Sequence, residues 1–164
     1  MAQYVVNRQI ELARESGSRA IQMYVAHHID LQNLRTARRL GRDENPVDPL
    51  LQGGEISVNR ISLDPERLAE LVYSSSLPTT LADSIKSAED SSVILERGLA
   101  KAIAHDIAVM RNNVLTIDPI FAFVTIALSQ MRLLRTILIG KSVGMDPEEI
   151  RRLLPPFLSA SPFA

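Results

Sequence analysis

A tract of residues near the start of the chain returns in related form later in the sequence. The first copy spans residues 24–41 and the second spans residues 123–140. The tripeptide Leu-Arg-Thr occurs in both copies, at residues 34–36 and again at residues 134–136. A repeat on this scale is the sequence sign of stacked helical units. It predicts a scaffold of repeated helix hairpins and disfavours a fold built around a single catalytic cleft.

The amino-acid composition predicts an all-α fold with an aliphatic core. Hydrophobic residues make up 46% of the 164-residue chain but aromatic residues only 4%, so aliphatic side chains must fill the interior. The alternating β-branched runs that are typical of strands are absent. The chain contains no cysteine, which excludes disulfides, zinc–thiolate sites and thiol nucleophiles. A net charge of −1 gives no global attraction for nucleic acid, which we do not expect as a partner.

Capping residues and apolar spacing predict seven helices joined by turns. Gly17 can end the first helix in a left-handed conformation, and Ser18 can cap the second. Asp-Pro pairs open the helices at residues 64 and 146. The predicted helices cover residues 2–15, 18–40, 64–73, 79–88, 92–111, 118–139 and 146–154.

Two of these helices carry specific expectations about burial. The uncharged run over residues 119–131 is shorter than the roughly 20 residues needed to cross a bilayer, and it is apolar on every side. It is therefore predicted to be a central buried helix of a soluble chain. The predicted buried stripe of the helix over residues 92–111 consists of Ile94, Leu95, Leu99, Ala102, Ile103 and Val109.

The repeat divides the chain unequally. Residues 1–55 are interpreted as a partial first repeat, a helix hairpin followed by a loop. Residues 56–164 are interpreted as a complete second repeat, and the two parts are expected to form one compact unit. The chain would then begin in the middle of a repeat, and residues 4–12 would expose an apolar strip that another surface covers.

Six short motifs occur along the chain in the order found in one protein family. They are Glu-Leu-Ala-Arg-Glu-Ser-Gly at 11–17, Ile-Asp-Leu-Gln-Asn-Leu-Arg-Thr at 29–36, Leu-Leu-Gln-Gly-Gly at 50–54, Ile-Leu-Glu-Arg at 94–97, Leu-Arg-Thr-Ile-Leu-Ile-Gly-Lys at 134–141 and Glu-Glu-Ile-Arg-Arg-Leu-Leu at 148–154. With these motifs the chain resembles the C-type subunits of archaeal and bacterial V/A-type ATPases, a family that includes the d-type subunits of vacuolar proton pumps. The resemblance implies a funnel of three related helical units, of which this chain would supply about two.

The resemblance also implies a function. Such a protein is a non-catalytic rotor-stalk subunit at the cytoplasmic face of the membrane, without cofactor or metal. It couples the central-shaft subunits to the membrane rotor ring of a machine that transports protons or sodium ions. The alternative is a stand-alone helical adaptor or binding module derived from the same repeat, which could self-associate through its exposed N-terminal hairpin. A closed surface, or a dimer that buries residues 4–12, would favour the adaptor.

A basic ridge is the candidate interface. Arg35, Arg38, Arg39 and Arg42 follow the spacing i, i+3, i+4, i+7, which places them on one face of a helix. Together with Arg135 of the second copy, they could dock an acidic surface of a shaft or ring subunit. The alternative is a solvated face paired with local carboxylates. The ridge has no interleaved aromatic residues, which disfavours nucleic acid.

Three other patterns are weaker. Gly140-Lys141-Ser142 matches the end of a phosphate-binding loop. However, the motif requires a glycine at position 135, and it follows a strand, whereas here a helix is predicted before residue 140. We therefore expect a helix C-cap with Gly140 and Gly144. His27 and Asp30 could hold a metal only if a third ligand such as His105 joined them. A Ser-His-Asp triad built on His105 and Asp106 has no motif to select its serine.

Overall fold

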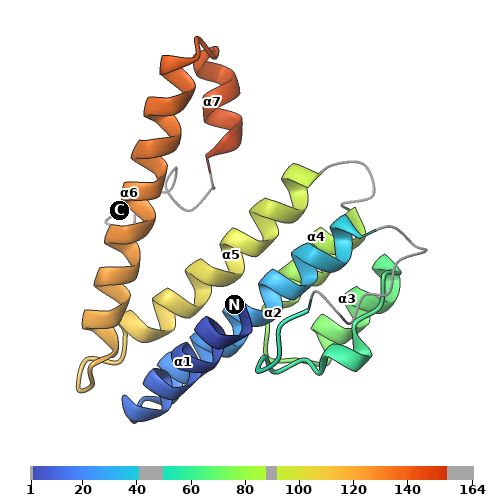
Figure 1. The fold of residues 1–164 in the computed structure, drawn as a ribbon, viewed down its shortest axis with the longest axis vertical. Coiled ribbons are helices and arrows are strands. Elements are labelled where there is room, and N and C mark those ends of the chain that lie inside the picture. Colours follow the sequence, from blue (N-terminus) through green and yellow to red (C-terminus); the bar gives the residue numbers. More distant parts are fainter. Residues whose placement is uncertain (1, 41–49, 88–91, 155–164) are drawn as a thin grey trace.

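The computed structural model describes residues 2–40, 50–87 and 92–154, and within these ranges it contains helices and turns but no strand, which confirms the all-α prediction (Figure 1). The elements are α1 (Ala2–Glu15), α2 (Arg19–Arg39), the 3-10 helix η1 (Val58–Arg60), α3 (Pro65–Tyr73), α4 (Thr79–Ser87), α5 (Ser92–Arg111), α6 (Asp118–Ser142) and α7 (Pro147–Leu153).

Local chemistry fixes the helix ends as the sequence predicts. Gly17 has a φ of 67°, and the Ser18 hydroxyl accepts a hydrogen bond from the Ile21 amide at 3.2 Å. Asp64 and Asp146 cap α3 and α7, each followed by a proline in the first turn. Gly41, which follows the predicted helix over residues 18–40, lies outside the described residues.

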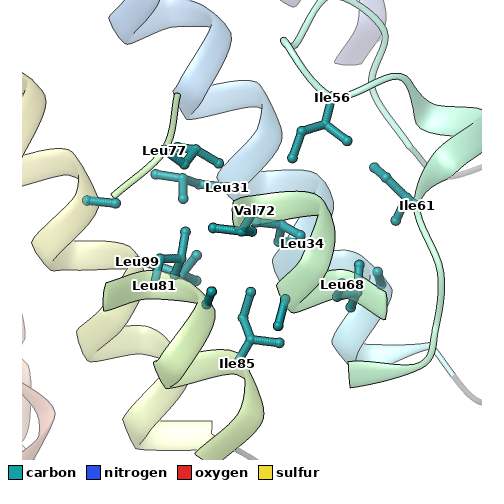
Figure 2. Close-up of a cluster of buried hydrophobic side chains, with 14 of the residues drawn as sticks. Leu31, Leu34, Ile56, Ile61, Leu68, Val72, Leu77, Leu81, Ile85 and Leu99 are labelled. Carbon is teal, nitrogen blue, oxygen red and sulfur yellow. The ribbon is translucent and has the colours of Figure 1, made fainter. Parts of the chain in front are cut away.

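The main hydrophobic core lies between α2, α3, α4 and α5 (Figure 2). Loop residues between α2 and α3, including Ile56 and Ile61, close it from one side. Helix spacing explains the pattern, because each helix contributes side chains three or four positions apart. The labelled core side chains of the four helices are Leu31, Leu34, Leu68, Val72, Leu81, Ile85 and Leu99.

A second, smaller cluster joins α1, α2, α5 and α6 through Ala13, Ile21, Ile107, Met110 and Ala122. Helix α5 therefore packs in the main core near its start and in the second cluster near its end. Most of its buried residues follow one another at spacings of three or four and so share one face: Leu95, Leu99, Ala102, Asp106 and Met110.

The burial of individual residues corrects part of the predicted stripe of α5. Leu95, Leu99 and Ala102 are buried as predicted, and Ile103 packs against both clusters. Ile94 and Val109 were wrongly assigned, since they are 37% and 51% exposed. Ile94 lies 100° around the helix from the buried Leu95, and Val109 lies 100° from the buried Met110, so both side chains fall off the buried face.

The prediction that residues 119–131 form a buried central helix is wrong. On α6 the buried residues are Asp118, Ala122, Leu133 and Gly140, all facing the body or α7. Helix α6 contacts α5 near its base and then diverges from it, so nothing in the described part of the chain covers its other side (Figure 1). By length and mean hydropathy α6 could cross a membrane, but that test alone is weak support for a membrane helix.

Specific hydrogen bonds fix both ends of α6. At its start the buried carboxylate of Asp118 accepts a hydrogen bond from the Asn113 amide at 2.6 Å, which closes the corner after α5. At its end the Met145 amide donates to the Gly140 carbonyl at 2.9 Å, and Gly144 has a φ of 76°. This is the Schellman pattern that ends many helices. Helix α7 then folds back so that Ile150 packs on Gly140.

Candidate protein interface

The basic ridge lies at the C-terminal end of α2. The Arg35 guanidinium makes a two-pronged ion pair with Glu96 of α5, with Nε–Oε1 and Nη2–Oε2 distances of 2.7 and 2.6 Å. Arg38 is half-buried and Arg39 is exposed, whereas Arg42 lies outside the described residues. Arg35 therefore braces α2 against α5, since bidentate Arg–carboxylate pairs are the more rigid kind. Among the described arginines of the ridge on α2, Arg39 is the most exposed to solvent.

A groove between α5 and α6 places Arg132, and not the predicted Arg135, beside Arg35 of the ridge. The groove has a volume of about 510 Å³ and is lined by Arg35, Glu96 and Arg132, with Leu153 of α7 at its edge. Arg135, the predicted partner of the ridge, is exposed on α6 but does not line this groove. Sequence reasoning missed Arg132. The i, i+3, i+4, i+7 spacing of the α6 residues that face the groove, at positions 129, 132, 133 and 136, could have identified it.

A second groove, of about 590 Å³, runs between α1, α2 and α6 and is mostly apolar. Its floor holds Tyr24, whose ring meets Phe121 edge to face at 5.5 Å and stacks on His28 at 6.0 Å. Burial raises the pKa of Tyr24 and lowers the pKa of His28, so both are neutral at pH 7. Arg132 lines this groove as well as the first, so the two grooves adjoin at that residue.

A polar network centred on the buried His27 ties the helices together and reaches the exposed residues Ser76 and Glu55. The Nδ1 atom of His27 on α2 lies 2.8 Å from a carboxylate oxygen of Asp106 on α5. Its Nε2 atom lies 2.7 Å from the hydroxyl oxygen of Ser76. Ser76 in turn donates to Glu55 at 2.6 Å. Because the single hydroxyl proton goes to Glu55, Nε2 must donate to Ser76, while Nδ1 donates to Asp106. The network thus requires the doubly protonated imidazolium.

Electrostatics agree with that protonation state. Burial alone would lower the pKa of His27, but the hydrogen bond to Asp106 and the charges of Asp106 and Glu55 outweigh it and raise the pKa. Asp30, one turn further along α2, accepts hydrogen bonds from the Glu55 and Ile56 amides at 2.8 and 3.2 Å. Burial raises the pKa of Asp30 to about 6 despite these two bonds, which lower it.

Ser76, His27 and Asp106 have the connectivity of a Ser-His-Asp triad, but their surroundings oppose catalysis. The Ser76 amide, the natural oxyanion donor, donates to the Glu55 carboxylate at 3.1 Å. A negative charge at that place would repel a developing oxyanion, and an imidazolium cannot act as a general base. The arrangement is therefore a structural clamp. Asp106 pairs with His27, so the triad considered from the sequence, with His105, does not form.

The other two sequence patterns also resolve into structural roles. His105 is exposed, and the described residues contain no group of three or more His, Cys, Asp or Glu side chains placed to bind a metal ion. Residues 140–142 end helix α6, and Gly144 takes the expected left-handed cap. Gly140 accepts the Met145 hydrogen bond of this cap through its carbonyl, and it lies in the last turns of the helix, where a Cβ would come within 2.8 Å of Ile150.

Comparison with known proteins gives one clear result. The family model described as ATP synthase (C/AC39) subunit matches residues 2–153, which is nearly the whole chain and every described helix. No individual curated protein and no solved structure matches the chain significantly.

Proposed function

Because the chain belongs to the ATP synthase (C/AC39) subunit family, we propose that it is a non-catalytic rotor-stalk subunit of a V/A-type ATPase. In this role it couples the central-shaft subunits to the membrane rotor ring, on the cytoplasmic face of a membrane across which protons or sodium ions move. The observation that carries the proposal is the family match over residues 2–153. We also propose the division into a partial repeat, residues 1–55, and a complete repeat, residues 56–164.

The way the helices are joined supports a mechanical role. A part that transmits torque must resist deformation, and close-packed helical cores do so. Here α2 and α5 are held together twice, by the His27–Asp106 hydrogen bond and by the Arg35–Glu96 ion pair. Ser76, in the turn between α3 and α4, is fastened to the same network.

The arginines around the groove between α5 and α6 are the proposed docking surface. Arg39 and Arg135 are exposed, and Arg132 lies in the groove beside Arg35. An array of like charges on one side of the molecule attracts an acidic partner surface and orients it during encounter. The partner proposed for this surface is an acidic face of a shaft or ring subunit.

Native mass spectrometry of the chain mixed with the central-shaft subunits of its own complex tests the proposal. A one-to-one complex is expected, and Arg39→Glu and Arg135→Glu should each weaken it about tenfold or more because they reverse an interfacial charge. Arg67→Glu, at an exposed arginine of α3, is the matched control and should leave binding unchanged. Absence of any complex contradicts the proposed role. An equal effect of all three changes keeps the role but refutes the docking surface.

A free-standing adaptor is the alternative function, and the exposure of apolar side chains on α1 helps to distinguish the two functions. Tyr4, Val5 and Leu12 are 77%, 51% and 49% exposed, so residues 4–12 present the apolar strip that the subunit hypothesis predicts. This favours a surface that meets another protein. Self-association through this hairpin is the adaptor's prediction. Size measurement of Tyr4→Ser and Leu12→Ser variants tests it, since loss of a dimer in both would favour the adaptor.

A further inference from the structure

The apolar groove between α1, α2 and α6 changes character along its length. Its volume of about 590 Å³ lies within the range of roughly 300–1,000 Å³ that is usual for small-molecule sites. The α6 residues that line it are all apolar over positions 117–124, whereas Thr125, Ser129 and Arg132 lie further along the helix. The facing walls from α1 and α2 are mainly apolar and include Leu12. The groove therefore has an apolar end and a polar end that carries a charge.

That charge belongs to Arg132, the one charged side chain among the described residues that line the groove. The ion pairs found within the described ranges do not include Arg132. Arg35, which faces it across the adjoining groove, is already paired with Glu96. Burial and then the charge of Arg132 lower the pKa of His28, so this neighbouring ring is neutral and adds no charge. Arg132 thus offers an unmatched positive charge to an anion at the polar end.

The length of the groove matches a single acyl chain. The α6 residues that line it extend from Ile117 to Arg132, which corresponds to about 22 Å of helix. An acyl chain spans one leaflet of a bilayer, which is about half of the hydrocarbon core of roughly 30 Å. A chain of that length therefore fits along the groove, with its head group at Arg132 and its methyl end towards Ile117.

A peptide fits this groove less well than an acyl chain does. An α-helix of the same length, about 10 Å across, has a volume of roughly 1,700 Å³, about three times the volume of the groove. An extended peptide would bury backbone amides and carbonyls against walls that are mainly apolar, and each of these groups is costly to bury without a hydrogen-bond partner. An acyl chain has no such groups and needs a polar partner only at its head.

From the unmatched charge of Arg132, the apolar walls and the length of the groove, we propose that it binds a single-chain anionic amphiphile, a fatty acid, as a monomer. The carboxylate of the ligand accepts hydrogen bonds from the Arg132 guanidinium and from the Ser129 hydroxyl. The acyl chain lies along Val124 and Phe121 of α6 and against Leu12 of α1. The proposal does not depend on the role in a rotary ATPase.

Fluorescence titration with cis-parinaric acid, below its critical micelle concentration, tests for this site. Saturable binding of one ligand per chain is expected, with displacement by oleate. Arg132→Gln should weaken binding of the acid about tenfold, because it removes a hydrogen bond between charged groups, and should leave binding of the methyl ester unchanged. Arg135→Gln is the matched control, since this exposed arginine of α6 lines neither groove, and it should bind the acid as the wild type does.

A second pair of variants tests the apolar wall. Val124→Asp should weaken binding of the acid and of its methyl ester at least tenfold, because it places a charge where the acyl chain lies. Leu138→Asp, at an exposed residue of the same helix that lines neither groove, is the control and should change neither affinity. Circular dichroism checks that all four variants remain helical.

Three results would overturn the proposal. The first is a lack of saturable binding, or equal binding by the wild type and all four variants, which would indicate only adventitious association with exposed apolar surface. The second is binding that appears only after residues 155–164 are removed, which would assign the groove to that segment of the chain. The third is binding of the protein to phosphatidylglycerol vesicles without binding of the monomeric acid, which would assign the groove to a membrane surface.

Discussion

Replacing His27 by alanine should cost the protein a large part of its stability. The change removes two hydrogen bonds that involve charged groups, one to Asp106 at 2.8 Å and one to Ser76 at 2.7 Å. It also leaves the Asp106 carboxylate, only 8% exposed as a residue, without its counter-ion. Loss of one partner from a buried ion pair typically costs about 3–5 kcal/mol. Ser76 and Glu55 are more exposed and can turn to water, so we expect about 3 kcal/mol.

The free energy of unfolding is measured by urea denaturation followed by circular dichroism. Small domains are stable by roughly 5–15 kcal/mol, so a loss of 3 kcal/mol is easily resolved. The double variant His27→Leu, Asp106→Leu is the informative companion, because removing both partners of a buried pair costs much less than removing one. If the losses of unfolding free energy in the single variants His27→Leu and Asp106→Leu add up to the loss in the double variant, the pair does not interact and the reasoning is refuted.

The same network predicts a pH dependence with a definite sign. The pKa of His27 is raised in the folded protein, so the imidazolium stabilises the fold fully below the unfolded value of about 6.5. That contribution is lost as the pH rises through the folded pKa above 6.5. Wild-type stability should therefore decline over this range, and the decline should be absent in His27→Ala. A wild-type curve that rises with pH there, with the variant flat, contradicts the protonated state.

Three further changes test other parts of the structure. Burial raises the pKa of Asp30 to about 6, so the free energy of unfolding should fall by roughly 2–3 kcal/mol as the pH rises from 4 to 6. Urea titrations of Asp30→Asn should not show this fall. Gly54→Ala should lower stability by about 1–3 kcal/mol, because the added Cβ would collide with the Asp30 carboxylate; an unchanged melting temperature would show that the loop yields easily. Leu68→Ala in the fully buried core should cost about 3 kcal/mol in the same denaturation assay, whereas Leu115→Ala at a 96% exposed position should cost close to nothing.

Helix ends were predictable because their causes are local. The serine before α2 and the Asp-Pro pairs before α3 and α7 act on amides two or three residues away. The turn at Gly17 needs only a residue that tolerates positive φ. Such interactions can be read from a short stretch of sequence, without knowledge of what the chain packs against.

The His27 network was not predictable in the same way. His27 was considered for a metal site with Asp30, one helical turn away, but its actual partners lie 49 and 79 residues along the chain. Only the packing of α2 on α5 and on the α3–α4 turn brings them together. His105 was considered as a third metal ligand and as the histidine of a triad with Asp106. It is exposed, because one residue along a helix from the buried Asp106 is a rotation of 100°.

The prediction that α6 is buried was wrong for another reason. Its apolar residues surround the helix, and that composition is typical of a helix covered on all sides. The described part of the chain covers only the side with Ala122, Leu133 and Gly140. Hydropathy indicates that a surface seeks cover, but it does not indicate whether the cover belongs to the same chain.

The corner between α5 and α6 gives the molecule a long arm. Helix α6 has 25 residues and is therefore about 37 Å long, and α7 is fastened to its far end by Ile150 on Gly140. The near end turns on the short span from Asn113 to Asp118, where Asn113 donates to the Asp118 carboxylate at 2.6 Å and the Thr116 hydroxyl bonds the backbone of both residues at 2.9 and 3.2 Å. A tilt of roughly 10° at this corner would displace α7 by about 6 Å, more than the rise of one helical turn. The distance between α7 and the body therefore changes measurably with a small tilt of α6. Energy transfer between one fluorophore on α7 and another on the body would measure that distance.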